Sequence, residues 1–195
     1  MKAFRSLTAR AAVLDRPDVD TDQILPKQFL KRIERTGYGG FLFYDWMEDP
    51  AFELNRPESK GAKILLTGSN FGCGSSREHA VWALQDYGFV VVVAPSFGDI
   101  FFSNAVQMGM VPVTLPAPKV KQLMRAVTGG GELTVDLETE TIAPAAGRVV
   151  PFEMDAFVRH CLLNGLDTIA RTLQHEDEIA AFEERSPSPV ATTEL

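Results

Sequence analysis

Three short apolar runs alternate with two amphipathic segments between residues 62 and 115, and this alternation limits the folds open to the chain. The runs are AKILLTG (62–68), FVVVVAP (89–95) and VPVTL (111–115), all typical of buried strands. Between the first two runs, apolar residues at helical spacing predict a helix that ends at Gly88. After the second run, Ser96 and Asp99 form a capping signal for another helix, which ends near Met108. Strand–helix–strand–helix–strand order implies right-handed crossovers, so the sequence predicts a parallel layer in an α/β domain.

The remaining segments predict further strands and helices around this layer. LTARAAVL (7–14) is a predicted strand, residues 119–127 a helix, and GGGELTVDLETETIA (129–143) a hairpin. Residues 154–164 and 167–184 are predicted helices, separated by Asn164-Gly165, whereas residues 15–60 lack clean periodicity. We therefore expect one domain over residues 1–185 and, from its composition, a disordered tail over residues 186–195.

The charge balance and the cysteine count exclude several classes of protein. The chain has 19 basic and 26 acidic residues and a net charge of −7, so no nucleic-acid partner is expected. No apolar run approaches the roughly 18 residues of a membrane span, and without a secretory signal the cytoplasm is the expected location. Cys73 and Cys161 are the only cysteines and the histidines are scattered, so no metal site is expected from this chain's own ligands.

The stretch GSNFGCGSSREHA (68–80) places an arginine where a helix is expected to begin. Ser75 and Glu78 fit a capping box with Ser75 as the cap, and the glycines would allow a tight turn. Arg77 would then lie in the first helical turn, where a cation loses roughly 0.3–1 kcal/mol against the helix dipole. An anionic ligand reverses this sign, because backbone N–H groups, two hydroxyls and a guanidinium could converge on one carboxylate or phosphate. The loop is therefore either a structural turn or an anion site.

This loop and three further stretches resemble a known family. NFGCGSSREHA resembles the signature of the small, swivelling-domain subunits of the aconitase superfamily. The stretches that resemble the bacterial small subunits of 3-isopropylmalate dehydratase are DVDTDQILPKQFL (18–30), DYGFVVVVAPSFGDIF (86–101) and residues 159–183. The resemblance covers the chain except its tail. It implies a single swivelling β/β/α-type domain in which the parallel strand–helix layer is joined by a β hairpin and C-terminal helices.

The resemblance also implies a reaction and a partner. The reaction is the isomerisation of 2-isopropylmalate to 3-isopropylmalate by dehydration and rehydration, a hydro-lyase step in leucine biosynthesis. In this superfamily a four-iron–four-sulfur cluster acts as a Lewis acid. Two distant cysteines cannot hold such a cluster. The resemblance therefore implies a separate large subunit that holds the cluster, with this chain closing over it and over a small malate-type substrate.

The family's motif suggests roles for three neighbouring residues of the loop. Ser75 would be the base that takes the substrate proton, and Ser76 and Arg77 would hold a substrate carboxylate. A serine hydroxyl is a poor base, so its ionised form would need stabilisation. The helix N-terminus and Arg77 are the local features that could supply it.

Asp20, Thr21 and Asp22 match the VDTD motif of the family. The resemblance implies that they support the active site, and this implication is strongest for Asp22, which would orient an arginine. The alternative is an Asx-type turn that caps the following segment. Lys31 and Arg32 stand where relatives carry a cation near the variable group of the substrate, and the sequence does not decide which of the two faces it.

Other polar side chains have both a functional and a structural interpretation. Asn104 could reach the site from the second predicted helix, although asparagines in helices often have no function. Cys73 could be a reactive thiol, but a small residue packed in a crowded loop is the favoured interpretation. His79 and His160 are expected to be structural or to lie at an interface.

Two alternative functions stay open. The chain could serve a related hydro-lyase of the homoaconitase or citraconate/methylmalate type, with residues 28–45 selecting the substrate. In a different class, it could be a non-catalytic module that binds a carboxylate or phosphate metabolite. Turnover after mixing with a cluster-bearing partner would distinguish an enzyme component from such a module.

Overall fold

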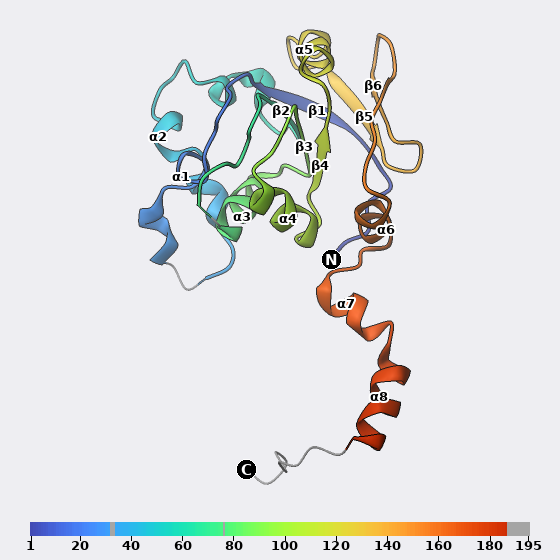
Figure 1. Cartoon of the computed structure of the whole chain (residues 1–195). Helices are drawn as coiled ribbons and strands as arrows, with labels where there is room; N and C mark the ends of the chain where they lie inside the picture. Colours follow the sequence, from blue (N-terminus) through green and yellow to red (C-terminus); the bar gives the residue numbers. More distant parts are fainter. Residues whose placement is uncertain (32–33, 76, 187–195) are drawn as a thin grey trace.

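The computed structural model describes residues 1–31, 34–75 and 77–186, which form a seven-stranded sheet with helices on both faces (Figure 1). The strands are β1 (Ser6–Leu14), β2 (Ile64–Thr67), β3 (Val91–Ala94), β4 (Val111–Thr114), β5 (Glu132–Asp136), β6 (Thr141–Pro144) and β7 (Val150–Pro151). Their order is β4-β3-β2-β1-β5-β6-β7. β1 to β4 pair in parallel and β5 to β7 are antiparallel. The predicted parallel layer and hairpin are therefore confirmed.

The longer helices are α3 (Glu78–Tyr87), α4 (Asp99–Gln107), α5 (Ala117–Ala126), α6 (Ala156–Asn164), α7 (Thr168–Leu173) and α8 (Glu176–Arg185). Four of them, α3 to α6, each follow a strand, and α7 and α8 follow α6. The segment between β1 and β2 contains short turns of α-helix and 3₁₀-helix (η) instead of long elements. These are α1 (Thr21–Ile24), η1 (Lys27–Lys31), η2 (Tyr38–Phe41), α2 (Tyr44–Met47), η3 (Glu53–Asn55) and η4 (Pro57–Ser59).

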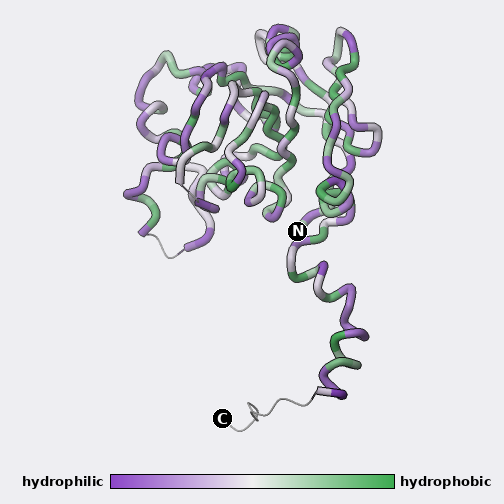
Figure 2. Tube along the Cα trace, in the orientation of Figure 1, coloured by the Kyte–Doolittle hydropathy of each residue, from purple (hydrophilic) through white to green (hydrophobic). Residues whose placement is uncertain are grey.

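The central strands are buried on both faces, which explains their continuous apolar sequences. In β2, Leu65 belongs to a core that includes Leu84 of α3, whereas Ile64 and Leu66 belong to a second core that includes Leu123 of α5. Hydrophobic residues accordingly concentrate along the strands and on the inner sides of the helices (Figure 2). Burial of each such side chain stabilises the fold by about 1.5–3 kcal/mol.

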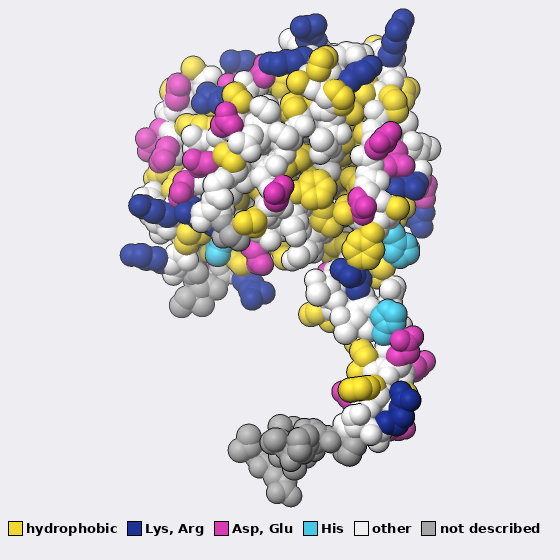
Figure 3. All heavy atoms as spheres, in the orientation of Figure 1, with side chains coloured by type: hydrophobic (Ala, Val, Ile, Leu, Met, Phe, Trp, Pro, Cys, Tyr) yellow, Lys and Arg dark blue, Asp and Glu magenta, His cyan; other side chains and the backbone are white. Residues whose placement is uncertain are grey.

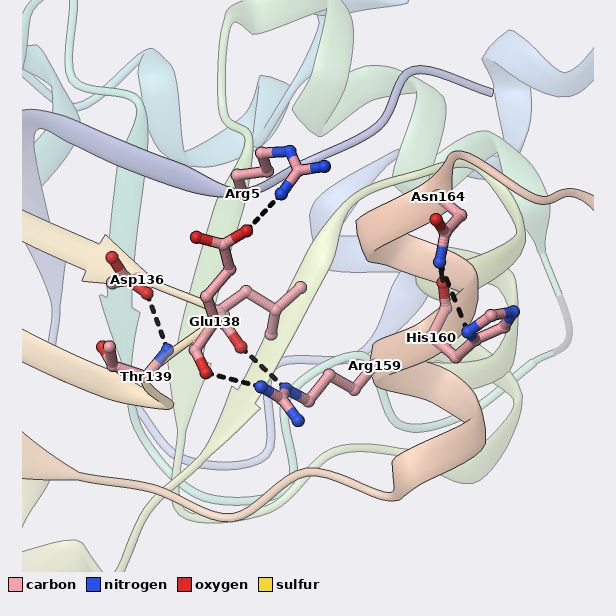
Figure 4. Close-up of polar contacts among 8 residues, drawn as sticks. Arg5, Asp136, Glu138, Thr139, Arg159, His160 and Asn164 are labelled. Atoms are coloured by element: carbon pink, nitrogen blue, oxygen red, sulfur yellow. Dashed lines mark hydrogen bonds and ion pairs between the residues drawn. The ribbon is translucent and has the colours of Figure 1, made fainter.

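Helix α6 is tied to the β5–β6 turn by a single arginine. Arg159 Nε donates to the Leu137 carbonyl at 2.8 Å, and its Nη2 donates to the Glu138 carbonyl (Figure 4). The Glu138 carboxylate pairs in turn with Arg5, before the start of β1. On the other side of α6, Asn164 Nδ2 donates to the His160 carbonyl at 2.8 Å. His160 is exposed on α6, and its expected structural or interface role stays a prediction.

The helix predicted over residues 167–184 is in fact two helices, with a break at Gln174 and His175. α8 begins with three acidic residues, Glu176 to Glu178. Negative side chains are stabilised at the positive N-terminal end of a helix dipole, and this stabilisation is lost in a helix interior. The two helices extend away from the sheet (Figure 1), and Ile169 and Phe182 are 73% and 62% exposed. The tail beyond residue 186 lies outside the described residues.

The predicted capping signal of α4 is wrong. The N-cap residue is Gly98, without a side-chain bond, and the Ser96 hydroxyl accepts a hydrogen bond from the Asn70 N–H at 2.8 Å instead. Ser96 therefore holds the neighbouring loop rather than the helix.

That loop comes very close to α4 at Gly72. A Cβ at this position would lie 2.2 Å from Cγ of Phe101, a side chain that is 2% exposed. Gly72 also has a φ of +72°, in the left-handed region that favours glycine. Gly61 has the same φ, but no heavy atom lies within 4 Å of the place that its Cβ would take.

We expect Gly72→Ala to destabilise the chain more than Gly61→Ala. Both variants carry the strain of a left-handed alanine, of the order of 1 kcal/mol. Only Gly72→Ala adds overpacking against Phe101, which costs about 1–3 kcal/mol more. Urea unfolding of the two variants beside the unchanged chain measures the difference. Equal losses would show that the contact with Phe101 does not fix the loop.

Candidate active site

The loop of residues 68–77 lies at the carboxyl ends of β1, β2 and β3, between the segments that follow β1 and β3. On one side Asp18 N–H donates to Ser69 O at 2.8 Å and Gly72 N–H donates to Val19 O at 2.7 Å. On the other side Phe71 N–H donates to Ser96 O at 3.1 Å. Ligands of open α/β sheets bind at this end of the strands, so the loop stands where a site is expected.

The predicted capping box at the start of α3 is wrong. The helix begins at Glu78, and its N-cap residue is Arg77, with φ −142°, ψ 109° and no side-chain bond to the helix. Ser75 lies two residues earlier, and its carbonyl accepts from the Thr21 hydroxyl at 3.0 Å. An N-cap carbonyl accepts the first intrahelical bond, and here the carbonyl that accepts from the Ala80 N–H, at 3.4 Å, is that of Arg77.

Arg77 forms a two-bond pair with Asp22. Arg77 Nη2 donates to Asp22 Oδ2 at 3.0 Å, and Nη1 donates to Oδ1. The Arg77 side chain is 15% exposed and that of Asp22 is 51% exposed. The hydrogen bonds from Arg77 hold the pKa of the Asp22 carboxyl below its usual value, so this carboxylate stays charged at neutral pH. The pair uses two of the five N–H donors of the guanidinium, and no residue that the structure describes accepts a hydrogen bond from the other three.

The other two residues of the VDTD motif hold the loop and α1 together. Asp20 caps α1, because its carboxylate accepts from Gln23 N–H at 2.8 Å while Gln23 Oε1 accepts from Asp20 N–H at 3.0 Å. Thr21 N–H donates to Cys73 O at 3.0 Å, beside the bond from its hydroxyl to Ser75. The predicted cap is therefore present at Asp20, and Asp22 is the residue that meets an arginine.

Ser75 is exposed, and its hydroxyl forms no hydrogen bond with any residue that the structure describes. It lies two residues before Arg77, at the open side of the loop. The hydroxyl is thus free for a ligand or a proton, although its role as a base stays a prediction. Ser76 lies outside the described residues.

A second feature of the site is an open hollow of about 650 Å³ next to Asp22. Its lining includes Lys27 and Lys31, both on η1. Lys31 is a predicted substrate contact, whereas Lys27 is not, although both lie on one short helical turn next to the VDTD motif. Arg32 lies outside the described residues, so the choice between Lys31 and Arg32 stays a prediction.

Three further predicted side chains lie near the loop. Asn104 is half-buried in α4 and its side chain forms no hydrogen bond with the described part of the loop, so its role also stays a prediction. Burial, and after it the carboxylates of Asp20 and Asp18, raise the pKa of the Cys73 thiol, which supports packing rather than reactivity. Burial also lowers the pKa of His79, whose ring centroid lies 4.5 Å from that of Trp82.

The described residues contain no group of three or more His, Cys, Asp or Glu side chains that could hold a metal ion. None of their helices has the length and apolar character needed to cross a membrane.

Comparison with protein families gives three consecutive matches along the chain. The Aconitase C-terminal domain matches residues 1–118, and LeuD_N matches residues 121–156. The C-terminal domain of 3-isopropylmalate dehydratase small subunits matches residues 168–188.

Curated relatives and a solved structure agree with these matches. The 3-isopropylmalate dehydratase small subunit of Rhodopirellula baltica is 58% identical over 193 residues, which cover 94% of this chain and 98% of the relative. The small subunit of Bacillus subtilis is 52% identical, and the alignment covers 96% of this chain and 98% of the relative. A crystal structure of 3-isopropylmalate dehydratase (leuD) from Methanocaldococcus jannaschii has a TM-score of 0.68 at 26% identity, covering 91% of this chain and 99% of that one. The chain therefore belongs to the family of 3-isopropylmalate dehydratase small subunits, within the aconitase superfamily.

Proposed function

We propose that this chain, joined to a large subunit, interconverts 2-isopropylmalate and 3-isopropylmalate by removal and return of water, as a step of leucine biosynthesis. The observation that carries the proposal is the Arg77–Asp22 pair beside the free Ser75 hydroxyl in a chain of this family. Related hydro-lyases would share this arrangement. We expect their substrates to be distinguished at the hollow beside Asp22, which Lys27 and Lys31 line.

Arg77 is assigned to a substrate carboxylate. Asp22 fixes the plane of the guanidinium before the substrate arrives, so less side-chain freedom is lost on binding. The three remaining N–H donors can form the charge-assisted, two-bond contact that carboxylates prefer. Ser76 is a second expected contact from the same loop.

Ser75 is assigned to the proton transfer. Its hydroxyl oxygen, as an alkoxide, would take the proton from the substrate carbon next to a carboxylate. The electron pair of that C–H bond would form the double bond, and the hydroxyl on the neighbouring carbon would leave with its own bonding pair as hydroxide. The guanidinium of Arg77 and the positive end of α3 are the nearby charges able to stabilise the alkoxide. Asn104 stays a proposed supporting contact.

The iron–sulfur cluster is assigned to the partner. The described residues offer no ligand group for a metal, and the two cysteines are too few for a four-iron–four-sulfur cluster. In the partner the cluster would supply the Lewis acid that helps the hydroxyl leave.

The helices α7 and α8 support a contact with such a partner. Exposed hydrophobic side chains on them include Ile169, Leu173 and Phe182. Figure 3 shows hydrophobic side chains along the part of the chain that extends away from the body. Large apolar side chains gathered on a helix that the chain itself leaves uncovered are typical of a protein interface.

Ser75→Ala is expected to abolish turnover without loss of stability. An exposed hydroxyl without a protein partner contributes within about 0.5 kcal/mol to folding, whereas loss of the base should slow the reaction by at least about 10²-fold. The measurement is isopropylmalate turnover by the anaerobically assembled complex, followed by the absorbance of the unsaturated intermediate, beside urea unfolding of the chain.

Ser69→Ala is the matched control for this variant, because Ser69 is also exposed but lies at the other end of the loop. It should leave both turnover and stability unchanged. Near-normal turnover in Ser75→Asn, which has no ionisable group, would refute the assignment of Ser75 as the base.

Arg77→Lys and Asp22→Asn should each raise KM for the substrate. Lysine lacks the planar guanidinium that binds a carboxylate through two bonds, and asparagine has no charge with which to hold the Arg77 guanidinium in place. If Asp22 acts only through Arg77, the double variant should bind substrate no more weakly than Arg77→Lys alone. Steady-state kinetics of all four combinations measure this coupling. Fully additive losses would mean that Asp22 contacts the substrate itself.

Phe182→Lys is expected to weaken binding to the large subunit while the chain stays folded, because Phe182 is 62% exposed. Ala181→Lys adds the same charge on another face of α8 and should bind normally. The two variants are compared by their co-purification with the large subunit. Equal binding by both variants would remove this face of α8 from the interface.

A further inference from the structure

A hollow of about 430 Å³ opens beside β1 and shares no lining residue with the loop of Ser75 and Arg77. Its walls come from β1, from the η3–η4 segment, and from the end of α5 with the glycine turn that follows. β5 pairs with β1 only over Ser6–Arg10, whereas β2 pairs with it over Ala11–Leu14. The second half of β1 therefore has no neighbouring strand on its β5 side, next to α5 (Figure 1).

The backbone of Val13 presents both a donor and an acceptor on this open side. Arg10 O accepts from Lys63 N–H at 3.1 Å, on the β2 side, and Ala11 N–H donates to Gly131 O at 3.1 Å, on the β5 side. Because these groups alternate along a strand, the N–H and C=O of Val13 point to the β5 side, beyond the last pair of β5. No described residue outside the sheet accepts a hydrogen bond from Val13 N–H.

Some of the charged side chains around the hollow, both positive and negative, are not paired with each other. Two ion pairs are already formed, between Lys121 and Asp15 and between Glu53 and Arg16. Arg56, Glu58 and Arg125 also line the hollow, and none of them forms an ion pair with a residue that the structure describes. A ligand that carries both an anion and a cation can pair with the guanidinium groups and with the carboxylate at once.

The rest of the lining is aliphatic. Ala11, Val13, Met124 and Val127 contribute to the wall, and no aromatic side chain does. Ala11, Met124 and Val127 belong to the core beneath α5, with 3%, 6% and 2% exposure, so this wall is rigid. The volume of about 430 Å³ lies at the small end of the range for ligand sites, so a small ligand fits.

We propose that this hollow binds an aliphatic α-amino acid. Its carboxylate would be held by Arg56 and Arg125, where charge-assisted bonds are strongest. Its ammonium would lie between Glu58 and the free carbonyl of Val13, and its side chain would rest on Met124. A simple anion would pair with the arginines alone and leave the Glu58 carboxylate without a ligand contact, whereas a zwitterion offers a group to each sign.

The test is isothermal titration calorimetry of the full chain, with L-leucine as the probe. Isocaproate is the same molecule without the ammonium group, and isoamylamine is the same molecule without the carboxylate. We expect L-leucine to bind saturably and about tenfold or more tightly than either analogue. Glu58→Gln and Arg125→Gln should each weaken this binding about tenfold or more, with circular dichroism confirming that both variants are folded.

Two further variants serve as controls. Lys119→Gln removes a cation from the exposed side of the same helix, away from the hollow, and should bind L-leucine normally. Arg77→Lys should also bind normally, so that this proposal and the proposed function succeed or fail separately. The proposal is overturned if L-leucine gives no saturable heat at millimolar concentration, if isocaproate binds equally well, or if Lys119→Gln loses as much binding as Arg125→Gln.

Discussion

The hydrogen bond from Gly72 N–H to the Val19 carbonyl, 2.7 Å long, joins the two segments from which the site is built. Asp22 follows Val19 by three residues, and Arg77 follows Gly72 by five. The bond forms where Gly72 adopts a positive φ and its backbone passes against the ring of Phe101. A packing contact with α4 thus fixes which part of the loop faces α1, and with it the meeting of Arg77 and Asp22.

Neighbouring residues of the VDTD motif have different roles, because some stabilise the fold and one belongs to the candidate site. Asp20 caps α1, and Thr21 holds the backbone of the loop at Cys73 and Ser75. Both contacts are structural, yet they determine where the Ser75 hydroxyl and the Arg77 guanidinium stand. The structural and functional interpretations of this motif are therefore not exclusive, because positioning the loop is itself what the proposed chemistry requires.

The sequence predicts those features of the structure that interactions between neighbouring residues determine. The apolar runs of β2, β3 and β4 are recognisable because those strands are buried on both faces. The capping box at Ser75 could not be judged from the sequence, because α3 begins only at Glu78 and the preceding loop is held by Thr21, which lies 54 positions before Ser75. The Arg77–Asp22 pair spans 55 positions and is suggested only by the family resemblance. The break before α8 depends on a cluster of acidic residues whose preference for a helix start competes with the continuing helical pattern.

The pairing of Arg77 with Asp22 also changes how the site must attract an anionic substrate. A guanidinium joined to a carboxylate carries no net charge, so the pair exerts little pull on a dianion beyond a Debye length of about 8 Å. The chain as a whole has a net charge of −7 and repels anions. Lys27 and Lys31 line the hollow next to Asp22 together with Asp45, so a small positive surplus is left there once Asp22 is paired with Arg77. We infer that these lysines would draw the proposed substrate toward the site, whereas Arg77, whose other three N–H donors meet no described residue, would recognise a carboxylate only on contact.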